Sequence, residues 1–199
     1  MTVRPEEAAY WDLQAANLCD NIWKRQWIAR HLLELPLIGK RILEIGVGPG
    51  NTFGAINTIF LGNIKYMGTD VSPKYCEFAK SAWGLTVKNA DIREIPADDD
   101  AFDYVVALDS LEHVRPEDRP QGYREIDRVL RKDKGKIVIN MPLTVSEHDQ
   151  QFDHGFNERD FLDLLTRLNM QCEEFRRYRM KTSDGTILIY GWGVGSRRR

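Results

Sequence analysis

Short apolar runs alternate with helix-like segments from residue 41 onward, and this alternation restricts the possible folds more than any other feature. The runs cover residues 41–45, 65–69, 85–90, 104–108 and 136–140, and helical patterns fill residues 52–61, 73–83 and 117–130. Buried parallel strands joined by crossover helices produce this pattern. We therefore expect an α/β fold with five parallel strands and helices on both faces of the sheet.

The pattern changes in the C-terminal part of the chain. A helix is expected at residues 158–168, followed by two strand-like runs at residues 172–182 and 186–194. Asp184 and Gly185 lie between these runs, and this dipeptide is typical of a hairpin turn. The sheet is therefore expected to have seven strands, mostly parallel, and to end in an antiparallel hairpin.

Apolar residues recur at helical spacing within the first 38 residues, where Trp23 and Trp27 are four positions apart. This spacing predicts two helices that end at Pro36, with the tryptophans packed against the sheet. A length of 199 residues suits one compact domain. We expect an N-terminal helical cap at residues 1–38 and a single core at residues 39–199.

Charge and cysteine usage exclude several classes of protein. The chain has 28 Lys and Arg against 30 Asp and Glu, so no overall field attracts nucleic acid or an anionic membrane. The longest charge-free stretch, residues 45–64, is interrupted by five glycines, and the first residues are too acidic for a signal peptide. The three cysteines Cys19, Cys76 and Cys172 lack the spacing of a metal site or a disulfide framework. No metal, no membrane partner and a cytoplasmic location are expected.

A glycine-rich loop directly follows the first predicted strand. Gly46, Gly48 and Gly50 carry no side chain, so the backbone can turn sharply and approach a ligand. Asp70 ends the second strand, where a carboxylate can accept hydrogen bonds from both hydroxyls of a ribose. Asp91 ends the third strand, and Ile92 places an apolar side chain beside it, which suits adenine. Together, the three strand ends indicate a ligand that contains a nucleoside.

In these segments the chain resembles the class I S-adenosylmethionine-dependent methyltransferases, in particular small single-domain members of the type 11 kind. The resemblance implies a Rossmann-like methyltransferase fold and S-adenosylmethionine as the cofactor. The matching segments are RILEIGVGPGN (41–51), YMGTDVSP (66–73), VKNADIREIP (87–96), FDYVVALDSLEHV (102–114) and RVLRKDKGKIVINMP (128–142).

The same resemblance implies which residues contact the cofactor. Asp109, at the end of the fourth strand, faces the methionine part or the substrate, and capping of the following helix is the alternative role. The remaining implied contacts are Glu44, Gly46, Gly48 and Gly50 at the amino acid end, Asp70 with Val71 at the ribose, and Asp91 with Ile92 at the adenine.

Residues 109–115 and 142–156 are expected to form the substrate rim, because ligands of open α/β sheets bind outside the carboxyl ends of the strands. His113, His148 and His154 lie in these segments. Histidine suits a general base because its unperturbed pKa lies near ~6.5. His154 is the first candidate and His148 the second, while packing or a surface position is the alternative for each. Tyr10 and Trp11 are expected in the core, with a lid over the site as the alternative.

These observations favour transfer of a methyl group to a small molecule, or to one exposed group, by in-line displacement. An NAD(P)-binding oxidoreductase is one alternative, although Asn51 replaces the last glycine of the dinucleotide fingerprint. A catalytically inactive partner subunit is another. A nucleic-acid-directed methyltransferase is a third, since Arg177, Arg179 and Lys181 share one face of a predicted strand. It is not favoured, because the fourth strand is not followed by the Asn/Asp-Pro-Pro-aromatic signature. The sequence leaves the oligomeric state open.

Overall fold

The computed structural model describes residues 3–15, 22–60, 62–143, 152–181 and 185–198. The predicted base candidate His148 and the predicted turn residue Asp184 lie outside the described residues. Within the described part of the chain, no helix is both long and apolar enough to cross a lipid bilayer.

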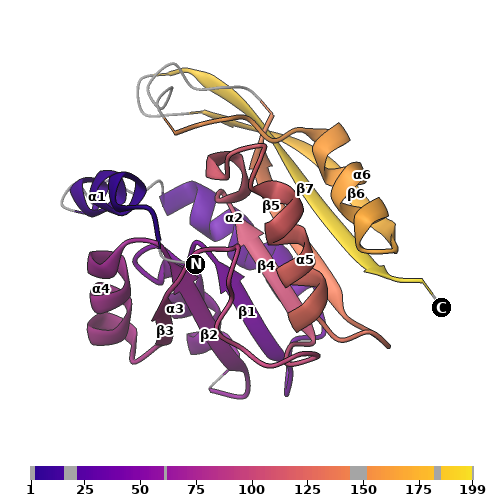
Figure 1. Ribbon diagram of the computed structural model, residues 1–199, viewed down its shortest axis with the longest axis horizontal. Coiled ribbons are helices and arrows are strands. Elements are labelled where there is room, and N and C mark those ends of the chain that lie inside the picture. The colour runs from indigo at the N-terminus through magenta and orange to yellow at the C-terminus, as the bar shows by residue number, and fades with distance from the viewer. Residues whose placement is uncertain (1–2, 16–21, 61, 144–151, 182–184, 199) are drawn as a thin grey trace.

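A seven-stranded sheet forms the centre of the molecule, in the order β3-β2-β1-β4-β5-β7-β6 (Figure 1). Strands β1 to β5 pair in parallel, and β7 pairs antiparallel with both β5 and β6. This confirms the predicted sheet and its closing hairpin. The strands are β1 (Arg41–Ile45), β2 (Lys65–Asp70), β3 (Thr86–Asn89), β4 (Tyr104–Leu108), β5 (Lys136–Pro142), β6 (Met170–Lys181) and β7 (Ile187–Arg197).

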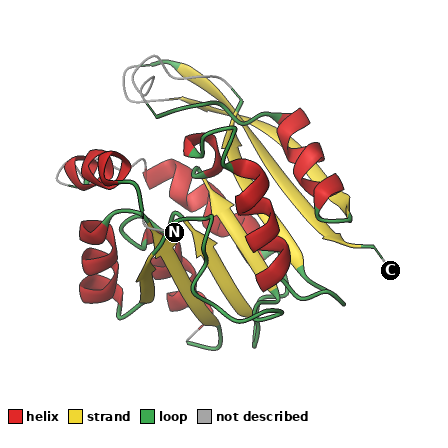
Figure 2. Ribbon diagram, viewed as in Figure 1, coloured by secondary structure: helices red, strands yellow, loops and turns green. Residues whose placement is uncertain are grey.

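Helices cover both faces of the sheet, as expected (Figure 2). The apolar side chains of α5 and α6 join one buried cluster with one face of the sheet, and those of α2, α3 and α4 join a second cluster with the other face. The helices are α1 (Pro5–Gln14), α2 (Ile22–Leu33), α3 (Asn51–Phe60), α4 (Pro73–Trp83), α5 (Arg119–Val129) and α6 (Glu158–Arg167), and a short 3-10 turn, Leu111–His113, was not predicted.

Strand β1 shows how one short run serves both clusters. Leu43 and Ile45 lie in the cluster with α5 and α6, whereas Ile42 lies in the cluster with α2 and α3. Successive side chains of a strand point to opposite faces, so a strand buried on both sides has an unbroken apolar pattern. Glu44, a charged residue between the apolar side chains of Leu43 and Ile45, is also buried, which marks it as a functional candidate.

Helix α2 packs on the C-terminal hairpin through Trp27. The Trp27 ring stacks on Tyr178 of β6 with 3.5 Å between ring centroids and meets Trp192 of β7 edge-on at 5.8 Å. The predicted packing of Trp27 against the sheet is confirmed, and the side chain of Trp23 lies outside the described residues. The division into a cap and a core stays a prediction, because Ile28 and Leu32 of α2 belong to a buried cluster of the sheet.

Gly193 and Gly195 of β7 allow α6 to pack close to the sheet, whereas Gly191 faces other residues. A Cβ atom at Gly193 would lie 2.6 Å from the Phe161 ring, and one at Gly195 would lie 2.2 Å from Leu165 Cδ2. Gly191 has more room, since its nearest neighbour would be Phe175 Cζ at 3.1 Å. Gly193 and Gly195 therefore form a groove that receives the apolar face of α6.

We expect Gly195→Ala to lower the free energy of unfolding by about 1–3 kcal/mol, because the added methyl group overpacks the contact with Leu165. Urea denaturation checks this value. Gly191→Ala is the matched control in the same strand and should be the milder change. Equal losses in the two variants would contradict the importance of the groove.

Candidate cofactor and active site

A cavity of about 280 Å³ lies at the carboxyl ends of β1, β2 and β4, where parallel strands place their following loops. Eight of the nine predicted cofactor residues line it: Glu44, Gly46, Gly48, Asp70, Val71, Asp91, Ile92 and Asp109. Gly50 is not among the lining residues. A Cβ atom there would meet Trp83 and Ala79 of α4, so Gly50 allows helix packing instead of ligand contact.

The glycine loop is fixed to strand β2 by main-chain contacts. The Gly46 and Val47 N–H groups both donate to the Thr69 carbonyl, at 2.9 and 3.0 Å. Gly46 has φ +69°, and a Cβ atom on it would lie 2.5 Å from Ser110 Cβ. Only glycine satisfies both the left-handed conformation and the close approach of the β4 end.

Asp70 connects the loop to its own strand. Its Oδ2 accepts the Gly48 N–H at 2.8 Å, and its Oδ1 accepts the Ser72 N–H at 2.9 Å. Burial raises the pKa of Asp70 to about 6. A carboxylate oxygen accepts more than one hydrogen bond, so Asp70 can hold the loop and still accept from ligand hydroxyls.

Asp91 has a cationic partner that sequence reasoning missed. Arg93 donates from Nε to Asp91 Oδ1 at 2.8 Å and from Nη2 to Asp91 Oδ2 at 2.7 Å. The same guanidinium also contacts Asp118 at 3.3 Å. This bidentate pair holds the Asp91 carboxylate rigidly at the cavity wall.

Glu44 is 2% exposed and accepts a hydrogen bond from the Tyr66 hydroxyl at 2.8 Å. Burial is the largest cause that raises the pKa of Glu44, to about 8, and nearby Asp70 raises it further. Near neutral pH the empty cavity therefore favours the protonated form of this carboxyl group. A cation bound beside it would favour the ionised form.

Acidic side chains outnumber basic ones on the cavity wall, although Glu7, Asp91 and Asp118 are paired with arginines. Arg115 is the only arginine or lysine among its lining residues in the described part of the chain. Such a wall favours a ligand that carries positive charge, and a sulfonium nucleoside with an α-amino group has two cationic centres. The acidic lining residues are Glu7, Glu44, Asp70, Asp91, Asp109 and Asp118.

Helix α1 forms one wall of the cavity through Glu7 and Trp11. The Trp11 ring meets His113 at 4.6 Å between centroids, and the Tyr10 ring meets Phe152 at 4.6 Å. No residue of α1 is fully buried. The expected core position of Tyr10 and Trp11 is therefore wrong, because α1 lies on the rim of the site and not under the sheet.

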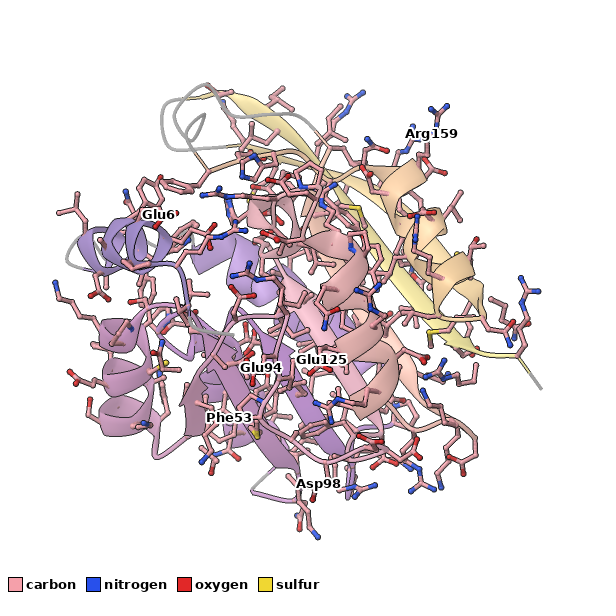
Figure 3. All side chains as sticks on the ribbon, viewed as in Figure 1. Glu6, Phe53, Glu94, Asp98, Glu125 and Arg159 are labelled. Carbon is pink, nitrogen blue, oxygen red and sulfur yellow. The ribbon has the colours of Figure 1, made fainter. Side chains whose placement is uncertain are left out.

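Charged and polar contacts hold α1 in this position. Arg4 pairs with Asp118 at 2.7 Å, and Arg115 pairs with Glu7 at 3.0 Å. Glu6, labelled on α1 in Figure 3, lies 3.4 Å from the same arginine. At the other end of α1, Asp12 accepts the Ser72 hydroxyl at 2.5 Å and the Lys74 N–H at 3.2 Å.

The three candidate histidines have different positions. His113 lines the cavity, and its Nδ1 lies 3.0 Å from the Phe152 carbonyl oxygen. A carbonyl only accepts, so Nδ1 carries the proton and Nε2 of the neutral ring is the basic nitrogen. The His154 side chain is exposed and does not line the cavity. The main-chain N–H of His154 donates to the Glu112 carbonyl at 2.8 Å. Of these two histidines, His113 is the one whose side chain lies at the cavity wall.

Asp109 lines the cavity with φ +54°, an unusual conformation for a residue with a side chain. Its Oδ1 accepts from Asn140 Nδ2 of β5 at 2.7 Å. Ser110, and not Asp109, occupies the N-cap position of the following helical turn. In the described ranges, no three His, Cys, Asp or Glu side chains come together in a metal-binding group.

The comparisons with known proteins agree with this geometry. Residues 42–133 match a family described as a methyltransferase domain. The chain is 33% identical over 143 residues to the 27-O-demethylrifamycin SV methyltransferase of Amycolatopsis mediterranei. The aligned region covers 68% of this chain and 50% of that protein. Residues 42–133 thus form a methyltransferase domain, and the comparisons support a class I S-adenosylmethionine-dependent methyltransferase.

Two further methyltransferases are also similar to the chain. The phthiotriol/phenolphthiotriol dimycocerosates methyltransferase of Mycobacterium leprae is 32% identical over 105 residues, which are 51% of this chain and 38% of the relative. A solved S-adenosylmethionine-dependent methyltransferase from Methanosarcina mazei has the same fold, with a TM-score of 0.71 at 16% identity over 84% of this chain and 96% of that one. The chain spans half or less of the length of the two curated relatives.

The residues of the cavity fit S-adenosylmethionine, the cofactor of this methyltransferase family. The glycine loop leaves its backbone open to a ligand, Asp70 offers carboxylate oxygens, and the acidic wall matches a cationic sulfonium. Sequence reasoning missed Glu7, Tyr75, Arg93 and Arg115. Glu7, Tyr75 and Arg115 come from segments outside the quoted motifs. Arg93 lies within one of them, but its pairing with Asp91 is a side-chain contact that the motif does not specify.

Proposed function

We propose that this chain transfers the methyl group of S-adenosylmethionine to a hydroxyl group of a small molecule by in-line displacement. The observation that carries the proposal is the single cavity that brings together the glycine loop, Glu44, Asp70 and His113. The names of the two curated relatives support a hydroxyl acceptor, since one refers to an O-demethyl compound and the other to triols.

Bound S-adenosylmethionine supplies an electrophilic methyl group whose leaving group is a neutral thioether. The protein then has mainly to position the acceptor in line with that methyl group and to exclude water. Trp11 of α1 lines the cavity and would restrict the access of water, and Tyr10 packs on Phe152. His113 Nε2 is the basic nitrogen that takes the hydroxyl proton.

Two alternative roles are weaker on this evidence. For a nucleic-acid acceptor, the basic face of β6 is the relevant surface, but Arg177 pairs with Glu158 and charged edge strands also prevent sheet pairing. The second alternative, an inactive partner subunit, is less attractive because the predicted cofactor residues line one cavity. The cytoplasmic location and the division at residue 38 stay predictions.

Calorimetric titration with S-adenosylhomocysteine tests the cofactor part of the proposal. We expect one ligand per chain and a dissociation constant about 100-fold higher for Asp70→Asn, since the variant loses charge-assisted hydrogen bonds to the loop and the ligand. NAD and NADP are the matched alternative ligands. Binding of a nicotinamide nucleotide without S-adenosylhomocysteine would reject the proposal in favour of an oxidoreductase.

Mass spectrometry of a panel of hydroxylated small molecules, incubated with S-adenosylmethionine carrying a deuterated methyl group, tests the acceptor part. His113→Asn should lower turnover of any methylated compound by about 100-fold while cofactor binding stays intact. His154→Asn is the matched control and should keep turnover within about 2-fold, because its side chain lies outside the cavity. If His154→Asn lost turnover and His113→Asn kept it, His154 would be the base instead.

A further inference from the structure

Asn140 contacts Asp109 through both its side chain and its main chain. Its Nδ2 donates to Asp109 Oδ1 at 2.7 Å, and its carbonyl oxygen accepts the Asp109 N–H at 3.0 Å. Asn140 is 1% exposed and lies on β5, beside the strand that Asp109 ends. The two contacts hold Asp109 in its left-handed conformation at the cavity wall.

Tyr178 makes the next contact, from a strand that is not adjacent to β5. Its hydroxyl lies 2.6 Å from Asn140 Oδ1, and β7 separates their two strands in the sheet. Burial raises the pKa of the Tyr178 phenol, so the hydroxyl keeps its proton and donates. The ring stacks on Trp27 at 3.5 Å and on Tyr190 at 5.4 Å, which fixes the direction of the hydroxyl.

The order of donors and acceptors allows one orientation of the Asn140 amide. Tyr178 donates to the amide oxygen, and the amide nitrogen donates to the carboxylate of Asp109. The opposite orientation would place the amide oxygen against a carboxylate, where both groups only accept. The phenol of Tyr178 therefore ensures that Asp109 meets a donor and keeps its carboxylate in one position.

The place of Asp109 in the sheet gives it a role different from that of Asp70. The residues that suit the amino acid, ribose and adenine parts follow β1, β2 and β3, on one side of the cavity. Asp109 follows β4, and its partner Asn140 lies on β5, on the other side of β1. His113, the candidate base, is four residues after Asp109 and lines the same cavity. This side of the cavity is available for the methyl acceptor.

We propose that Asn140 and Tyr178 are positioning residues that hold Asp109 beside the point of methyl transfer, where its carboxylate accepts a hydrogen bond from the acceptor hydroxyl. The inference deepens the proposed function and rests on it. The hydroxyl has a single proton, which lies against Asp109 in the bound acceptor. It passes to His113 Nε2 as the oxygen attacks the methyl carbon and the bond from that carbon to sulfur breaks. The C-terminal hairpin thereby contributes to a site that the first five strands otherwise form.

Two cofactor analogues test this position without a known acceptor. Sinefungin carries an amino group where S-adenosylmethionine carries the transferred methyl group, and S-adenosylhomocysteine carries nothing there. A carboxylate beside that point favours sinefungin over S-adenosylhomocysteine, and the ratio of their dissociation constants, measured by calorimetry, reports its position. We expect Asp109→Asn to lower this preference by about 10-fold, and Tyr178→Phe and Asn140→Leu by about 3- to 10-fold.

Tyr104→Phe is the matched control, because it removes a buried phenol at the far end of β4 and should leave the ratio unchanged. Equal weakening of both analogues in Tyr178→Phe and Asn140→Leu would show a general structural role and overturn the inference. An unchanged ratio of the two dissociation constants in Tyr178→Phe and Asn140→Leu would also overturn the inference. If the unaltered protein does not bind S-adenosylhomocysteine, the proposed function itself fails, which is a distinguishable result.

Discussion

Binding of S-adenosylhomocysteine is expected to weaken about 100-fold when Gly46 is replaced by alanine. The new Cβ atom would lie 2.5 Å from Ser110 Cβ, and the residue would keep a φ of +69° that disfavours any side chain. The loop must then move away from the end of β4, and its main-chain groups no longer meet the ligand. Calorimetric titration measures the loss directly.

Two further substitutions separate the causes of this effect. Gly39→Ala carries the same conformational penalty, with φ +73° and no atom within 4 Å of its Cβ position, and it lies outside the cavity lining. It should reduce stability by about 1–2 kcal/mol and leave affinity unchanged. Ser110→Gly removes the atom that the new methyl group meets, so Gly46→Ala with Ser110→Gly should recover part of the lost affinity. No recovery in the double variant would argue against the close approach of the loop and β4.

The second large effect concerns pH and Glu44. Burial raises the pKa of Glu44 to about 8, so below that pH the empty site holds this carboxyl group protonated. A cationic ligand favours the carboxylate, so ligand binding near pH 7.5 should release a proton, and affinity should rise with pH until about 8. Asp70, with a pKa of about 6, is already ionised at pH 7.5 and adds little to this release.

The stability of the ligand-free protein should fall as pH rises, in contrast to the affinity for the ligand. Because the folded-state pKa of Glu44 lies above its ordinary value of 4.5, the folded state binds more protons than the unfolded state between about pH 4.5 and 8. The free energy of unfolding contributed by this group is therefore present at low pH and is lost as pH rises through that window. Thermal denaturation at several pH values measures this slope.

Calorimetry of ligand binding in buffers with different ionisation enthalpies measures the proton release, and Glu44→Gln should abolish it. The variant retains an oxygen that accepts the Tyr66 hydroxyl but loses the charge, so affinity should fall by about 10- to 100-fold. Tyr66→Phe removes a hydrogen bond that lowers the pKa of Glu44 and should move the pH midpoint upward. Undiminished proton release in Glu44→Gln would assign the titration to another group.

Most of the fold and of the cofactor contacts could be predicted because they depend on patterns among residues close together in the sequence. The apolar runs and their spacing located every strand to within three residues, because strand burial depends on local pattern. Asp70 and Asp91 were predictable because they stand at or just after the end of a strand, and strand ends converge at one edge of a parallel sheet. Glu44 was predicted only from the resemblance to the methyltransferase family.

The remaining contacts depend on chain register, which local pattern does not determine. Tyr178 and Asn140 are 38 positions apart, and their contact follows from the pairing of both strands with β7. Arg93 and Asp118 meet across a loop and a helix start for the same reason. His154 was favoured because it lies in a predicted rim segment, yet the side chain of a loop residue can point either way, and here it faces solvent.

Helix α1 forms part of the cavity wall without a single fully buried residue of its own. Its ion pairs with Arg115 and Asp118 join partly exposed side chains, and such pairs weaken as counterions accumulate around them. Detaching this helix would leave both apolar clusters of the sheet whole. Passage of ligands into and out of the cavity should therefore depend more strongly on ionic strength than the apolar packing of the sheet does.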